Sequence, residues 1–126
     1  MASTETGDQR MSPFWWLPFG QVPEIEAVDL KARLDRHEPL QLIDVRTPGE
    51  FAGGHIHGSI NVPINQLRSA LPGLKIDRNR PIIAVCQTAH RSPPAVRLLR
   101  QAGFNAQQLR GGMISWNRAR FPTTRK

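Results

Sequence analysis

The sequence predicts an α/β fold in which helices cover both faces of a mainly parallel central sheet. Short apolar runs, typical of buried strands, alternate along the chain with segments whose apolar residues recur every three or four positions, as in helices. The chain has 126 residues, the usual size of one domain. Hydrophobic residues make up 39% of it and charged residues 21%, which is typical of a soluble globular protein and excludes fibrous and wholly disordered classes.

The first half of the chain predicts three strands, each followed by a helix. Thr47 is a favourable helix N-cap and Pro48 a favourable first helical residue, so the second helix begins there. The second strand carries Asp44 near its carboxyl end. The expected strand–helix pairs, from the amino end, are Ile25 with 27–35, 40–45 with 47–51, and 60–62 with 64–71.

The second half of the chain contains the clearest strand, at 81–85, which is β-branched, apolar and ends directly before Cys86. Ser92 followed by two prolines is typical of a helix start, and Gly103 ends the apolar spacing of that helix. The chain then predicts a last strand at 106–109, a break at Gly111 and Gly112, and a last helix at 113–118.

Composition divides the chain into an N-terminal segment (1–23), a regular domain (24–121) and a short C-terminal tail (122–126). Residues 13–23 are aromatic and rich in Pro and Gly but lack the features of a secretory signal. We expect them to pack on the domain, and the alternatives are docking on a partner or a peripheral membrane contact through 13–19. No apolar run approaches the roughly 20 residues of a transmembrane helix, and a cytoplasmic location is expected.

The single cysteine lies where an α/β sheet binds ligands, beyond the carboxyl end of the strand at 81–85. A short loop follows it, and the predicted helix begins at Ser92. Loop amides and a helix N-terminus form a concave site for an anion, and Arg91 adds a full positive charge. All three features favour the thiolate, so Cys86 is expected to be a nucleophile with a lowered pKa. The alternative is a small buried apolar residue.

Three ordered motifs support the nucleophile. The first is a cysteine loop that closes in Arg-Ser. The second is Asp-x-Arg followed by Glu-Phe and His-Ile-x-Gly-x-Ile-Asn-x-Pro, and the third is Gly-Gly followed by a tryptophan. In this chain they are Cys86 to Ser92; Asp44, Arg46, Glu50, Phe51 and His55 to Pro63; and Gly111, Gly112 and Trp116. Over 24–121 the chain therefore resembles the single-domain rhodaneses, a family of sulfurtransferases.

The resemblance implies a rhodanese-like fold and a two-step sulfur transfer. Cys86 would take the outer sulfur of thiosulfate or a related donor, carry it as a persulfide, and pass it to cyanide in an assay or to a thiol in the cell. Arg91 would attract the anionic donor and help to hold the loop, whose amides would stabilise the persulfide. No metal or organic cofactor is implied.

The rest of the loop would contact substrate: Gln87, Thr88, Ala89, His90 and Ser92. Many family members have glycine where Ala89 stands, so this loop is expected to differ slightly in shape. His90 is either an extra cation at the site or an exposed imidazole without a catalytic role. Asp44, Arg46 and His55 are expected to be structural residues near the site, and Asp44 and Arg46 are expected to form structural pairs at the strand ends.

Two other functions stay open. A rhodanese-like module that binds a partner or senses redox state would also keep a reactive thiol. A cysteine phosphatase or arsenate reductase is less favoured, because phosphatases of this fold place five residues between Cys and Arg and histidine before the cysteine. This chain has four residues in the loop and Val85 before it.

Charge is unevenly distributed along this basic chain, whose formal net charge is +7. Residues 1–67 carry five basic and nine acidic side chains, whereas residues 68–126 carry twelve basic and one acidic. The positive field of the second half would suit a small anionic sulfur donor or an acidic sulfur-carrier protein. Nucleic acid is not the expected partner, because aromatic residues do not alternate with the basic ones.

Overall fold

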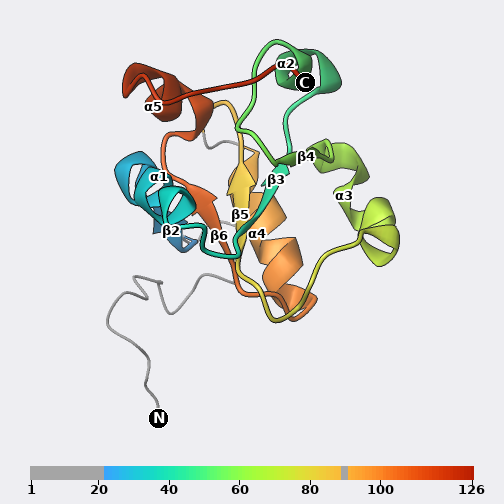
Figure 1. Cartoon of the computed structure of the whole chain (residues 1–126). Helices are drawn as coiled ribbons and strands as arrows, with labels where there is room; N and C mark the ends of the chain where they lie inside the picture. Colours follow the sequence, from blue (N-terminus) through green and yellow to red (C-terminus); the bar gives the residue numbers. More distant parts are fainter. Residues whose placement is uncertain (1–21, 89–90) are drawn as a thin grey trace.

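The computed structural model of the chain describes residues 22–88 and 91–126 (Figure 1). The expectations for the aromatic segment at 13–19 and for Ala89 and His90 therefore fall outside the described residues. No helix within the described ranges is long and apolar enough to cross a lipid bilayer.

A five-stranded parallel sheet forms the centre of the molecule, which confirms the predicted α/β class. Its order is β2-β6-β5-β3-β4, so the strand that precedes Cys86 lies in the middle. The strands are β2 (Glu24–Ile25), β3 (Gln41–Asp44), β4 (Ile60–Asn61), β5 (Ile82–Val85) and β6 (Ala106–Leu109).

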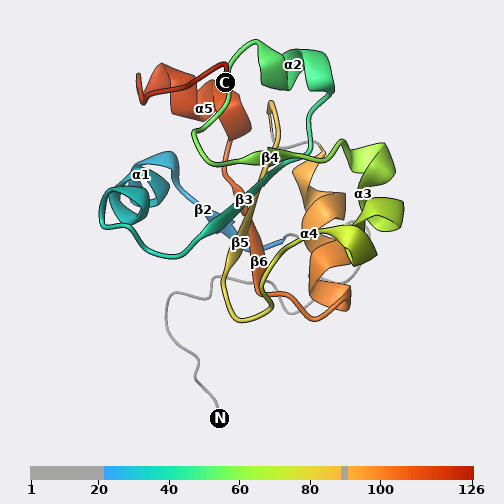
Figure 2. The same cartoon turned by 45° about the vertical axis from the view of Figure 1, so that its right-hand side comes forward.

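Helices cover both faces of this sheet (Figures 1 and 2). On one face lie α1 (Ala27–Asp35) and α5 (Gly112–Arg118), and on the other lie α3 (Ile64–Ala70) and α4 (Ser92–Gln101). A 3-10 turn, η1 (Leu71–Gly73), follows α3. The short helix α2 (Pro48–Ala52) lies beyond the carboxyl ends of the strands, on the same side as the residues that follow β5.

Alternation along β5 divides the core into two apolar clusters, because successive strand side chains point to opposite faces. Ile82, Ala84 and Cys86 belong to the cluster that includes Val96 and Leu99 of α4. Ile83 and Val85 belong to the cluster that includes Leu30 of α1 and Trp116 of α5. Cys86 thus continues the α4-facing side of the central strand.

The register of the sheet brings the carboxyl ends of β3 and β5 together in space. Asp44 pairs with Val85, and the amide of Val45 donates to the carbonyl of Val85 over 2.8 Å. The segments that follow these strands, around Arg46 and Cys86, therefore leave the sheet side by side at the carboxyl ends of the strands.

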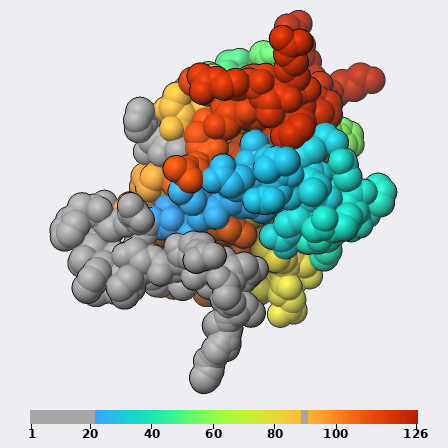
Figure 3. All heavy atoms as spheres, turned by 90° about the vertical axis from the view of Figure 1, so that its left-hand side faces the viewer, coloured from blue at the N-terminus to red at the C-terminus, as the bar shows by residue number. Residues whose placement is uncertain are grey.

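The C-terminal residues lie against the domain. His55 and Thr124 exchange two backbone hydrogen bonds of 2.8 Å each, and the indole N–H of Trp116 donates to the carbonyl of Pro122. In Figure 3 the end of the chain and α5 lie beside α1 on one face of the molecule. The segment after α5 therefore closes over the residues that precede β4.

Candidate functional site

Cys86 is fully buried at the carboxyl end of β5, and backbone amides face its sulfur. The amide N–H of Arg91, at the N-cap of α4, donates to Sγ over 3.1 Å. The amide of Thr88 is a second hydrogen-bond donor to the same atom. Sulfur surrounded by amides in this way is stabilised as an anion.

Two opposing effects act on the pKa of the Cys86 thiol. Burial raises the pKa, because desolvation disfavours the thiolate. The amides of Arg91 and Thr88 and the Arg91 guanidinium lower it, and together they prevail, so the pKa lies below the ordinary cysteine value. The thiolate is the nucleophilic form of cysteine, so this environment prepares Cys86 for nucleophilic attack.

The carbonyl groups of the same loop are held by α5. The amide of Met113 donates to the carbonyl of Cys86 over 2.8 Å, and the amide of Ile114 donates to that of Gln87 over 3.1 Å. Gly112 permits this contact: its φ is +59°, and a Cβ there would lie 2.3 Å from the Cys86 carbonyl oxygen. The Gly-Gly motif thus brings the start of α5 against the cysteine loop.

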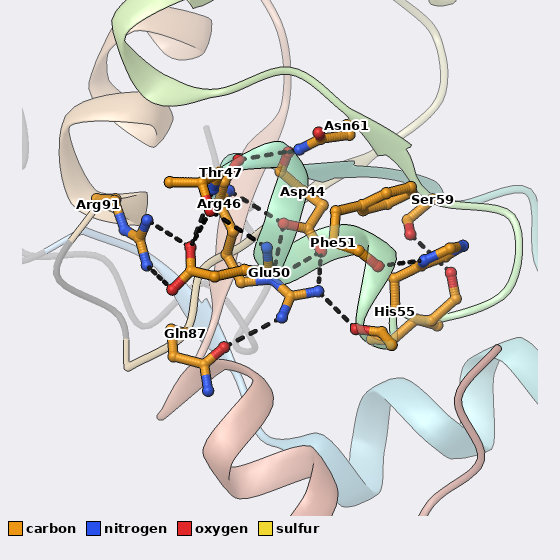
Figure 4. Close-up of polar contacts among 12 residues, drawn as sticks. Asp44, Arg46, Thr47, Glu50, Phe51, His55, Ser59, Asn61, Gln87 and Arg91 are labelled. Atoms are coloured by element: carbon orange, nitrogen blue, oxygen red, sulfur yellow. Dashed lines mark hydrogen bonds and ion pairs between the residues drawn. The ribbon is translucent and has the colours of Figure 1, made fainter. Parts of the chain in front are cut away.

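The Arg91 side chain forms an ion pair with Glu50. Its two terminal nitrogens contact the two carboxylate oxygens over 2.7 and 3.0 Å (Figure 4). The same carboxylate accepts from the amide of Thr47, and Thr47 Oγ1 accepts from the amide of Glu50, so a capping box holds Glu50 at the start of α2. The ion pair with Arg91 and these hydrogen bonds lower the pKa of Glu50 to about 2 and raise that of Arg91.

A second ion pair, which is buried, joins Asp44 to Arg46 (Figure 4). Arg46 is 3% exposed and Asp44 is fully buried, and the shortest contact between them is 2.8 Å. Arg46 also donates to the carbonyl of Gly54 and to the side-chain oxygen of Gln87, over 2.8 and 3.1 Å. The residue directly after the cysteine is thereby tied to the end of β3.

Two other predicted residues are bound away from the sulfur. The ring nitrogens of His55 lie 2.8 Å from the carbonyl oxygens of Phe51 and Lys126, and the ring stacks on that of Phe51, so His55 joins α2 to the C-terminal segment. The Ser92 hydroxyl is buried and donates to the side chain of Gln108 over 2.7 Å, which ties α4 to β6.

A pocket of about 360 Å³ opens beside these contacts. It shares Arg46, Glu50 and Gln87 with them, and its other walls come from α2, α5 and the C-terminal segment. Those walls are Gly49, Gly53, Gly54, Asn117 and Thr123. Within the described ranges, no three His, Cys, Asp or Glu side chains gather as a metal site would require.

Sequence reasoning assigned no role to Glu50, Asn117 or Thr123. The capping pattern of Thr47 and Glu50 was readable in the sequence, but nothing indicated that the Glu50 carboxylate also reaches Arg91, 41 residues away. Asn117 and Thr123 carry no local signal at all, because only the packing of α5 and of the segment after it brings them to the pocket.

Comparison with known proteins gives consistent results. A family model described as a rhodanese-like domain matches residues 26–119. The chain is 33% identical over 102 residues to a sulfurtransferase of Allochromatium vinosum, covering 80% of this chain and 94% of that protein. A crystal structure of a rhodanese-related protein from Thermoplasma volcanium superposes with a TM-score of 0.74 at 33% identity, covering 82% of this chain and 98% of that one.

Another relative is larger than this chain. An HTH-type transcriptional regulator of Mycobacterium tuberculosis is 42% identical over 83 residues, which is 64% of this chain and 36% of the regulator. The chain therefore spans about a third of that relative's length.

Proposed function

We propose that this chain, which belongs to the rhodanese-like domain family, is a sulfurtransferase that works through a persulfide on Cys86. Sulfane sulfur would come from thiosulfate or a related donor and go to a thiophilic acceptor. The observation that carries the proposal is the Arg91 amide hydrogen bond to Cys86 Sγ at the carboxyl end of the central strand. The sulfurtransferase name of a relative matched over 94% of its length supports it.

The first step would be attack of the Cys86 thiolate on the outer sulfur of thiosulfate. A sulfur–sulfur bond forms to Cys86, the sulfur–sulfur bond of the donor breaks, and sulfite leaves with the bonding electron pair. The persulfide keeps the single negative charge of the thiolate. The amides that favour the thiolate would stabilise this charge as well.

The second step would return the thiolate. Cyanide attacks the outer sulfur of the persulfide and leaves as thiocyanate, or a thiolate acceptor attacks it and leaves as a new persulfide. In either case the electron pair of the broken bond returns to Cys86. The covalent persulfide is the only intermediate, so the scheme needs no metal or organic cofactor.

Access to the sulfur is a requirement of this scheme. Cys86 is fully buried, so a donor reaches Sγ only when neighbouring atoms move. We propose a small anionic donor, or an acidic sulfur-carrier protein as partner, in a cytoplasmic setting whose reducing conditions keep Cys86 free.

Mass spectrometry after incubation with thiosulfate tests the function. The chain is expected to gain one sulfur atom on Cys86 and to release one sulfite per chain. The Cys86→Ser variant is the control and should gain nothing, because Cys86 is the only cysteine. Failure of the wild-type chain to gain sulfur, or a gain that persists in Cys86→Ser, would overturn the proposal.

A second candidate is a sensing module, and the relative named as a transcriptional regulator favours it. Cys86 would then be oxidised by peroxide to sulfenic acid, with water as the other product. Incubation with peroxide and with thiosulfate in parallel separates the two functions. Rapid gain of oxygen without any gain of sulfur would favour the sensing module.

A further inference from the structure

Two arginines are already neutralised from within the protein: Arg46, which lines the pocket, and Arg91, which binds the pocket residue Glu50. Arg46 faces the Asp44 carboxylate in a buried pair. Arg91 faces the Glu50 carboxylate through two parallel contacts, the geometry in which guanidinium and carboxylate bind most specifically. Neither positive charge is left uncompensated for a substrate.

The remaining described residues that line the pocket add no charge. They are glycine backbone, the amides of Gln87 and Asn117, and the hydroxyl of Thr123. Counted over the described residues, the lining of the pocket that adjoins the cysteine loop is therefore neutral, although the chain as a whole has a net charge of +7.

Glu50 is the residue that keeps the pocket neutral beside Arg91. Its pKa of about 2 means that the carboxylate is ionised at any working pH. A dianion that approaches Arg91 must either share the guanidinium with this carboxylate or displace it, and each alternative costs electrostatic energy that an uncharged donor does not meet.

We propose that Glu50 sets the donor specificity of this site, so that it selects organic sulfane-sulfur donors of low charge over dianionic thiosulfate. The inference rests on the proposed sulfur transfer and names its substrate class. Glu50 acts here as a specificity-determining residue through Arg91, and it is not a group that attacks or leaves.

A matched pair of donors isolates the effect of charge. Thiosulfate carries two negative charges, and the methanethiosulfonate anion, in which a methyl group replaces one oxyanion, carries one. Both lose their outer sulfur to the Cys86 thiolate: thiosulfate releases sulfite and methanethiosulfonate releases methanesulfinate, each leaving group with the bonding electron pair. Their intrinsic reactivities differ, so the informative quantity is the change that a variant causes in each.

The experiment compares Glu50→Gln with the wild-type chain. The glutamine keeps the shape of the side chain but removes its charge. We expect kcat/KM to rise roughly tenfold for thiosulfate and roughly threefold for methanethiosulfonate, because repulsion by the lost charge scales with the charge of the donor. Glu38→Gln is the matched control, because Glu38 is likewise paired with arginine, here Arg33 and Arg36, but lies before β3, at the opposite end of the strands. It should change neither value.

Equal changes for the two donors, or a fall for thiosulfate alone, would overturn the specificity role of Glu50. Sulfur transfer would still be measured in that case, so the proposed function would survive. If the wild-type chain took sulfur from neither donor, the proposed function itself would be contradicted.

A measurement on the wild-type chain tests the same inference without depending on the folding of a variant. Sulfate and methanesulfonate are unreactive ions of similar shape with two charges and one charge. We expect methanesulfonate to be the stronger competitive inhibitor of sulfur transfer. Stronger inhibition by sulfate would contradict the inference.

Discussion

At the scale of the residue, the reactivity of the Cys86 thiol depends on the polar groups that surround its sulfur. A buried cysteine without polar neighbours is inert, because burial alone raises its pKa. Here the amides of Arg91 and Thr88 and the Arg91 guanidinium reverse that effect. The amides belong to the backbone and survive substitution, so the side-chain part can be removed separately.

Substitution of Arg91 by methionine tests the side-chain part. The variant keeps the amide that donates to Sγ but loses the guanidinium, so the pKa of Cys86 should rise and thiolate should form only at higher pH. Absorbance near 240 nm during a pH titration reports the thiolate of this single cysteine. Arg110→Met, which alters surface ion pairs with Glu24 and Glu26, is the control and should not shift the titration. An unshifted titration in Arg91→Met would show that the amides alone lower the pKa.

At the scale of the element, the start of α5 and the loop after β5 form one unit. Met113 and Ile114 bind the carbonyls of Cys86 and Gln87, and this contact needs the backbone of α5 to come closer than any side chain would allow. α2 supports the same loop from the other side through Glu50. The loop is thus held by two helices that are not adjacent to it in sequence.

Substitution of Gly112 by alanine tests this contact. The new Cβ would meet the Cys86 carbonyl at 2.3 Å in a backbone conformation with φ of +59°, so the free energy of unfolding should fall by about 2 kcal/mol or more. Urea unfolding measures the loss. Gly49→Ala in α2 is the control, since a methyl group at that position would have no atom within 4 Å, and it should be neutral or stabilising by up to about 1 kcal/mol. Equal stabilities for the two variants would contradict the close approach.

At the scale of the whole molecule, the positive charge and the neutral pocket act at different distances. The net charge of +7 creates a field that reaches anions in solution, whereas the pairs at Glu50 and Asp44 neutralise only the arginines beside the pocket. We therefore expect the attraction of a donor and its retention in the pocket to be separate effects.

Salt dependence measures the long-range effect. Between ionic strengths of about 0.01 and 0.5 M, kcat/KM for thiosulfate should fall as screening increases, and kcat should change little because steering affects the encounter. The fall should be shallower for methanethiosulfonate, which carries half the charge. Values of kcat/KM that do not respond to salt would rule out steering by the net charge.

Local sequence determined the order of strands and helices, the parallel α/β class and the place of Cys86 at a strand end. These features follow from side-chain periodicity and from capping residues such as Thr47, which act within a few positions of the chain. Only the tertiary structure decided that Glu50 binds Arg91, that Gly112 approaches Cys86, and that Thr123 lines the pocket. Each of these contacts joins residues that are tens of positions apart, and their meeting depends on how the sheet and its helices pack.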